Sequence, residues 1–243
     1  MPNIVYDAFE TYVENLKLTL LFSIPFIIAF AIPLFAPLPT YITVGSIFLR
    51  VASLSFNINM FEIAIIVVAT FFSLLFLSFA FVAIAYIVKA KRTYGKITRD
   101  MLNSIEKHTG KVFVIFIVYA AILILAYALS YPTGYSGLIT SAVGFILFLF
   151  IFYAPSAIVI DNKRMARAIK DSTKLLFREP QYFIIWLFLA IFVLSLFDEL
   201  FILLLGTFYS RYAMLIFSSL FALPYFVIFQ AEAYMKRFPL LKH

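Results

Sequence analysis

The sequence lacks cysteine and is poor in histidine, glycine and charge, with two histidines, seven glycines and 13% charged side chains in 243 residues. Without cysteine, the chain can form neither a disulfide nor a thiolate metal site. His108 lies in a charged segment and His243 is the last residue, so neither an H-E-x-x-H zinc motif nor an intramembrane serine–histidine pair is present. The glycines form no G-x-x-x-x-G-K-[ST] phosphate loop. We therefore expect a protein that is not an enzyme and that binds no cofactor or metal.

Apolar residues, in contrast, are abundant, since they make up 65% of the chain and give it a mean hydropathy of +1.05. A soluble protein has about 45–50% apolar residues, so the excess indicates a surface that faces lipid. A helix that crosses a bilayer needs about 20 mostly apolar residues and satisfies its own backbone hydrogen bonds. Six stretches qualify: 18–37, 60–88, 112–130, 138–160, 182–205 and 212–235. The sequence thus predicts an all-α polytopic membrane protein with six transmembrane helices, in a single membrane domain over residues 1–243.

Basic residues are distributed very unevenly between the connections of these six stretches. All 19 lysines and arginines except Arg50 and Arg211 fall on one side of the predicted membrane. Cytoplasmic loops are enriched in lysine and arginine, so we expect a multi-pass protein of the cell membrane with cytoplasmic N- and C-termini. The net charge of +7 has the same origin. Because no nucleic-acid-binding motif accompanies it, we expect no nucleic-acid partner.

Two of the basic segments also have the periodicity of amphipathic helices. In 161–181 and in 94–108, apolar residues recur on one helix face while the basic residues lie largely elsewhere. Such helices lie in the headgroup layer and attract anionic lipid; a merely solvated loop helix is the alternative. We predict lipid-headgroup contacts by Lys96, Arg99, Lys107, Arg164, Arg167, Lys170, Lys174 and Arg178. The partners expected are therefore membrane lipids with anionic headgroups, and a protein partner at the cytoplasmic face is a further option.

The chain also contains an internal repeat. The N-terminal segment has an apolar stripe like the two basic ones, but its polar face is acidic and carries Asp7, Glu10 and Glu14. Each of the three amphipathic segments leads into a pair of predicted spans. The second spans of the pairs align over 78–91, 152–163 and 221–236. We therefore predict three tandem repeats, each an interfacial helix plus a helical pair, over roughly 1–90, 91–162 and 163–243.

One stretch resembles a known group of proteins. The sequence APSAIVIDNKRMARAIKDSTKLLFREPQYFIIW at 154–186 has a proline-containing span end, a loop helix with an apolar face and a following span. This arrangement resembles that of small prokaryotic six-span membrane proteins of uncharacterised function, which are similar to the membrane domain found on some glycerophosphodiester phosphodiesterases. The resemblance implies a six-span fold. It implies no catalytic residue, because the phosphodiesterase chemistry belongs to a separate soluble domain.

Charged residues at membrane depth are costly and mark candidate sites. Asp198 lies 12 residues beyond Trp186, or about 18 Å along a helix, which places it in the outer half of the bilayer if Trp186 marks the inner interface. We predict an intramembrane polar cluster of Arg50, Glu62, Asp198, Glu199 and Arg211. Three interpretations stay open: ion pairs that pin helices, an early end of the fifth span at Phe197, and a pathway for protons, cations or a polar substrate. Gln230 and Glu232 are interpreted instead as ordinary residues of the inner boundary.

These observations favour an integral membrane protein without a catalytic site, in a scaffold, lipid-organising or accessory role. The alternative is a transport component, such as an export-type ABC permease-like subunit or a small ion or solute transporter. Export permeases have six spans, an N-terminal interfacial helix and a cytoplasmic helix after the second span, as expected for this chain. The threefold spacing of this sequence, however, departs from their pattern. A lipid-modifying enzyme is a third option, for which no acid, base or metal set is found.

Overall fold

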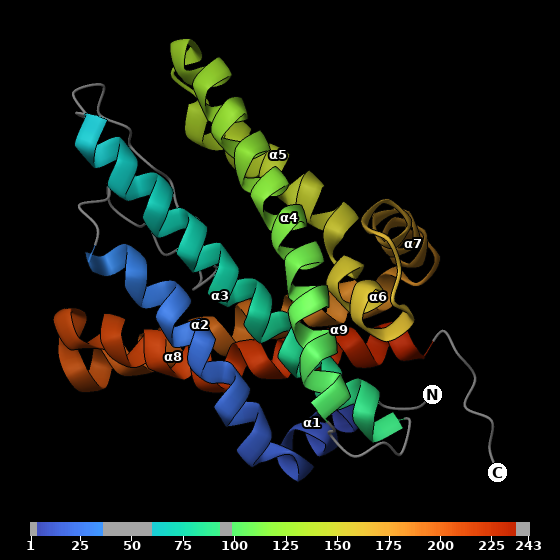
Figure 1. The fold of residues 1–243 in the computed structure, drawn as a ribbon. Coiled ribbons are helices and arrows are strands. Elements are labelled where there is room, and N and C mark those ends of the chain that lie inside the picture. Colours follow the sequence, from blue (N-terminus) through green and yellow to red (C-terminus); the bar gives the residue numbers. More distant parts are fainter. Residues whose placement is uncertain (1–3, 36–59, 93–98, 237–243) are drawn as a thin grey trace.

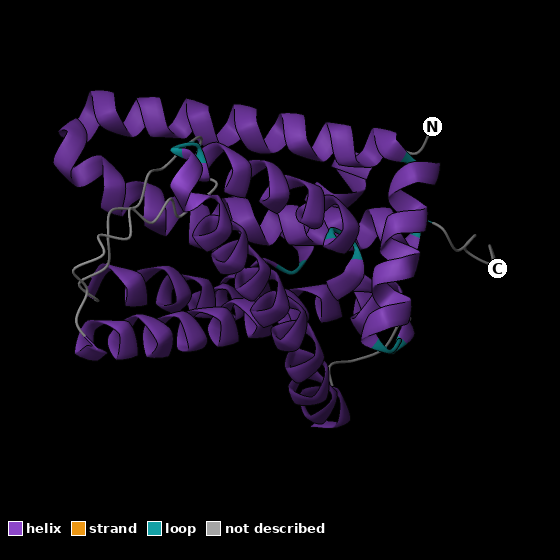
Figure 2. Cartoon of the chain, turned by 90° about the horizontal axis from the view of Figure 1, so that it is seen from above, coloured by secondary structure: helices purple, strands orange, loops and turns teal. Residues whose placement is uncertain are grey.

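The computed structural model describes residues 4–35, 60–92 and 99–236, and every regular element in these ranges is helical (Figures 1 and 2). The elements are α1 (Ile4–Glu14), α2 (Leu16–Phe35), α3 (Met60–Arg92), α4 (Arg99–Ser130), a 3-10 turn (Tyr131–Thr133), α5 (Ser136–Ile151), α6 (Ala154–Asp161), α7 (Met165–Arg178), α8 (Pro180–Phe217), a π-helical turn (Ser218–Ala222) and α9 (Leu223–Met235). Four stretches of these ranges are long and apolar enough to cross a membrane, or five if the bent pair α1–α2 counts as one. The helical class and the presence of several membrane-spanning helices are thus as the sequence predicts.

The chain folds back on itself inside α8. Gly206 has φ 73° and ψ 167°, which is not a helical conformation. Phe197 on the first arm stacks on Phe217 of the second, with 4.0 Å between ring centroids, and Trp186 Nε1 donates to the Phe226 carbonyl at 3.1 Å. The fold-back lies at the left edge of Figure 1. The 56-residue apolar stretch that ends the described chain therefore consists of two antiparallel arms.

Three helical hairpins converge on one end of the molecule and diverge toward the other (Figure 1). They are α2–α3, α4–α5–α6 and α8–α9, and the elements α3, α6 and α9 contact one another where the hairpins meet. The short helices α1 and α7 lie at this converging end, α1 against α9 and α7 against α5 and α6. The converging end is therefore where all three hairpins contact one another.

The most deeply buried part of the core lies at the same end. All described residues of 82–88, 152–159 and 226–234 are buried, and these ranges belong to the three segments that align in the sequence. Lipid tails are as apolar as these side chains, so close packing holds such helices together, and small residues allow it. The small residues at the contact include Ala80, Ala83, Ala85, Ala154, Ala157, Ala231 and Ala233, all of them buried. The segments with the strongest internal likeness thus form the centre of the fold.

Local sequence determines where the helices break. Asn15 Nδ2 donates to the Thr11 carbonyl at 3.0 Å and ends α1, after which α2 leaves at 92°. Pro180 disfavours a helical conformation at the residue before it, and Glu179 accordingly has φ −133° and ψ 62° between α7 and α8. The π-helical turn precedes Pro224 and accommodates the missing backbone donor of that proline.

The segment 94–108 differs from its prediction as a separate amphipathic helix. Within its described part, α4 begins at Arg99 and continues without a break to Ser130. No proline lies between these two residues, and Gly110 costs a helix only about 1 kcal/mol, so nothing separates the amphipathic part from the apolar part. The second predicted repeat unit therefore has a helix that is continuous where the first and third predicted units have a bend.

Candidate functional site: a polar layer at the converging end

Charged and polar side chains form a layer where the three hairpins meet. We call the following residues the polar layer: Asp7, Glu10, Thr11, Glu14, Tyr86, Lys91, His108, Lys111, Asp161, Asn162, Lys163, Asp171, Glu232, Tyr234 and Lys236. Its contacts fall into three networks, and each network joins two hairpins. The polar layer is therefore an electrostatic connection between parts of the chain that are far apart in sequence.

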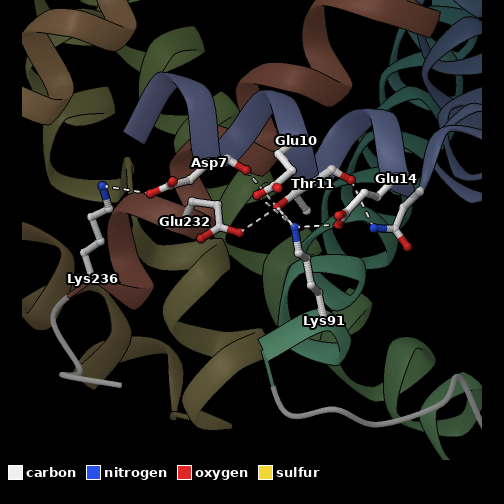
Figure 3. A network of polar contacts seen from close by, with 8 residues as sticks. Asp7, Glu10, Thr11, Glu14, Lys91, Glu232 and Lys236 are labelled. Atoms are coloured by element: carbon white, nitrogen blue, oxygen red, sulfur yellow. Dashed lines mark hydrogen bonds and ion pairs between the residues drawn. The ribbon is translucent and has the colours of Figure 1, made fainter. Parts of the chain in front are cut away.

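The first network joins α1 to α3 and α9 (Figure 3). Thr11 Oγ1 lies 3.0 Å from Glu232 Oε1 and 3.2 Å from Lys91 Nζ. Lys91 Nζ also lies 2.6 Å from a carboxylate oxygen of Glu14. Thr11 and Glu232 are almost fully buried, at 1% and 2% exposure. Figure 3 shows Lys236 reaching Asp7 at the other end of α1, where Nζ and Oδ2 are 3.2 Å apart.

The second network joins α6, α7 and α9 around Lys163. Its Nζ lies 2.6 Å from Asp161 Oδ2 and 2.7 Å from Asp171 Oδ2, and it donates to Tyr234 Oη at 3.1 Å. Tyr234 Oη in turn donates to Asp161 Oδ2 at 2.6 Å. Burial lowers the pKa of Lys163, but the hydrogen bonds with Asp161, Asp171 and Tyr234 outweigh it and raise the pKa above its ordinary value. Because the pKa of Lys163 is raised in the folded protein, its charged form stabilises the fold at neutral pH. This stabilisation is lost only in strong base.

The third network joins α3 and α4 to the end of α6. His108 is 4% exposed; its Nδ1 lies 3.0 Å from Tyr86 Oη, and its Nε2 lies 3.0 Å from Asn162 Oδ1. Lys111 Nζ donates to the same Oδ1 at 3.1 Å. Asn162 ends α6 in the left-handed region, with φ 50°, which asparagine tolerates better than most residues. His108 therefore links side chains of two different hairpins, Tyr86 of α3 and Asn162 at the end of α6.

The polar layer contains acidic and basic groups in contact, so its charges largely neutralise one another. The described residues contain no group of three or more His, Asp or Glu side chains placed to hold a metal ion. The arrangement can hold three hairpins in one orientation, because each network fixes two of them by directional bonds. A further link is made by Lys89, whose Nζ donates to the Val159 carbonyl at 2.7 Å near the end of α6.

The predicted lipid-headgroup residues of α7 lie together on its exposed side. Arg164, Arg167, Lys170, Lys174 and Arg178 are all exposed, and the opposite face of α7 buries Ala168, Ser172, Leu175 and Leu176. On α4, Lys107 is also exposed. Lys96 and the side chain of Arg99 lie outside the described residues. Contact of these side chains with lipid stays a prediction.

The predicted intramembrane polar cluster is only partly described. Arg50 and the side chain of Glu62 lie outside the described residues. Asp198 is half-buried, whereas Glu199 and Arg211 are exposed, and no ion pair joins these three described side chains. α8 continues through Phe197 to Gly206, so the fifth predicted span does not end early at Phe197.

Gln230 and Glu232 differ from their prediction as ordinary residues of the inner boundary, because both belong to the core. Both are buried, not at a hydrated boundary; Gln230 Nε2 donates to the Phe152 carbonyl, and Glu232 contacts Thr11. A signal existed in α1, where Asp7, Thr11 and Glu14 recur at helical spacing and form one polar face. The partners of that face lie more than 70 residues away in the sequence, so its pairing could not be read from local pattern.

Comparisons with protein families, with curated proteins and with solved structures found no match to this chain. The likeness of residues 154–186 to six-span membrane proteins therefore stays a prediction from the sequence.

Proposed function

We propose that the chain is a six-span membrane protein with both termini in the cytoplasm, and that it organises lipid or protein partners at the inner face without catalysis. The antiparallel arms of α8 and α9 support the count of six, because each arm of the hairpin is long enough for one crossing. The convergence of α3, α6 and α9 supports three units. The polar layer then lies at the cytoplasmic ends of the hairpins, where lysine and arginine are concentrated.

The exposed basic face of α7 carries this proposal. Its five cations have no acidic neighbour among the exposed residues of the same helix, since Asp171 is half-buried and bonded to Lys163. The helix lies between two apolar stretches of membrane-spanning length. Near a membrane surface, each lysine or arginine contributes about 1 kcal/mol of attraction to anionic lipid. A surface of this kind recruits anionic lipid around the protein, which is the lipid-organising role.

The orientation can be tested by cysteine labelling, because the natural chain has no cysteine. We expect Lys107→Cys and Lys170→Cys to react with a membrane-impermeant maleimide only after the inner face is opened. Tyr135→Cys, at the exposed turn before α5, should react in intact cells. The cysteine-free chain is the control and should not react. Reaction of Lys107→Cys and Lys170→Cys from opposite sides of the membrane would contradict the six-span arrangement.

The lipid-organising role predicts that charge on α7 controls which lipids accompany the protein. We expect the triple variant Arg167→Glu, Lys170→Glu, Lys174→Glu to lose at least about tenfold of its enrichment in anionic phospholipid, since each cation contributes about 1 kcal/mol. The measurement is the ratio of phosphatidylglycerol to phosphatidylcholine that stays bound after extraction from mixed vesicles. Arg211→Glu, which changes charge at the opposite end of the molecule, should keep the wild-type ratio. An unchanged ratio in the triple variant would refute this role for α7.

A further inference from the structure

One face of α2 combines a single cation with an exposed apolar stripe. Lys17, Leu21, Ile24 and Ile28 follow each other at spacings of four, three and four residues, which places them on the same side of a helix. Lys17 is exposed, and the three apolar side chains are 57%, 46% and 37% exposed. The opposite side of α2 is buried in the protein, as Thr19, Ser23 and Phe26 are inaccessible. This face is therefore available to molecules outside the chain.

Lys17 is the only basic residue between positions 4 and 35, and no described residue pairs with it. The acidic residues nearest in sequence are already bonded elsewhere, because Glu10 and Glu14 lie 3.7 and 2.6 Å from Lys91 Nζ. The ammonium group of Lys17 thus has three donors that no described residue uses. It is thus placed to donate to an anion from outside the described protein.

The dimensions of this face match one leaflet of a bilayer. Ile28 lies eleven positions beyond Lys17, which is about 16 Å along a helix, and half of a hydrocarbon core is about 15 Å. At the level of Lys17 the chain bends by 92° between α1 and α2. The bend leaves a shallow, open hollow of about 410 Å³ lined by residues 13–18, and Glu14, the one acidic residue of this lining, is paired with Lys91. There is thus room for a polar group beside Lys17, at the end of α2 from which the apolar stripe begins.

We propose that this face of α2 is a binding site for one phospholipid. Lys17 Nζ donates to the phosphate in the hollow at the α1–α2 bend, and an acyl chain lies along Leu21, Ile24 and Ile28. This inference rests on the proposed membrane function, and it adds a discrete site to the diffuse charge attraction of α7. A free phosphate lacks the acyl chain that the apolar stripe would contact. An uncharged lipid lacks the anion that Lys17 would bind.

The site can be tested in detergent by native mass spectrometry of the full chain. We expect one dioleoyl-phosphatidylglycerol to bind the wild-type protein, and Lys17→Gln to weaken this binding about tenfold, as expected when one charge-assisted hydrogen bond is lost. The double variant Leu21→Ala, Ile24→Ala should weaken it as well, but without a change in the affinity for glycerophosphate. Arg211→Gln removes one exposed cation elsewhere and should bind like the wild type.

Ligands that lack either the acyl chains or the phosphate test the two contacts of the site separately. Binding of glycerophosphate as tight as that of the phospholipid would overturn the acyl-chain contact, and equal binding of dioleoylglycerol would overturn the phosphate contact. Equal phospholipid affinity of wild type and Lys17→Gln would overturn the site. Because detergent micelles have no inner or outer leaflet, these results do not depend on the orientation. Cysteine labelling that contradicts cytoplasmic termini would therefore refute the proposed topology and leave the site on α2 standing.

Discussion

Gly206→Ala is expected to lower the free energy of unfolding by about 2 kcal/mol, and Gly206→Val by about 3 kcal/mol. The reason is the backbone, since φ 73° with ψ 167° belongs to a region that is open almost only to glycine. Steric crowding does not contribute, because a methyl group added at Gly206 would meet no atom within 4 Å. The cost should therefore appear even though the site is exposed.

Trp186 reports on this hairpin directly. It is the only tryptophan, and its ring packs against Phe226 on the opposite arm, 5.6 Å away between centroids. Unfolding in detergent, followed by its fluorescence, measures the change. The matched control is Gly110→Ala, at a helical and equally uncrowded glycine, which should gain about 0.5–1 kcal/mol instead. Equal effects at the two positions would contradict the special conformation of Gly206.

Thr11→Val is expected to cost about 2 kcal/mol of unfolding free energy, which is the penalty for leaving buried polar partners without their hydrogen bond. Valine has nearly the shape of threonine, so packing changes little. The lost hydroxyl is the atom that contacts Glu232 Oε1 at 3.0 Å and Lys91 Nζ at 3.2 Å. Thr11→Ser keeps the hydroxyl and should retain most of the stability.

A double-mutant cycle separates this contact from other effects of the substitutions. Glu232→Leu removes the buried carboxylate that Thr11 contacts, so Thr11→Val should cost at least about 1 kcal/mol less in the Glu232→Leu background. Additive effects of the two substitutions would show that Thr11 and Glu232 are not coupled. The same fluorescence measurement serves for all four proteins.

The sequence predicts the helices well wherever a local signal exists. The boundary expected between residues 205 and 212 corresponds to the turn at Gly206, and the apolar and basic faces expected for 161–181 correspond to the buried and exposed sides of α7. Hydrophobic run length and helical periodicity are properties of neighbouring residues, so they can be recognised in the sequence without knowledge of the fold.

The rest depends on contacts between distant residues. The acidic face of α1 pairs with Lys91, the last residue but one of α3, and with Lys236, which follows the last residue of α9. Glu232 reads locally as a boundary residue because it lies four residues before Lys236, yet the packing of α1 over α9 buries it. The contact partners of these acidic side chains are therefore set by the way the hairpins pack, which the local sequence does not show.

The concentration of bonds at one end has a mechanical consequence. Beyond the polar layer and the core of α3, α6 and α9, the hairpins diverge (Figure 1) and expose side chains such as Val67, Leu125 and Phe192. In the six-span arrangement proposed above, acyl chains would fill the space between them, and we expect the spread of the hairpins to follow the thickness and lateral pressure of the bilayer. Because helices accommodate a thinner membrane by greater tilt, we expect the hairpins to tilt about the end that the polar layer holds together.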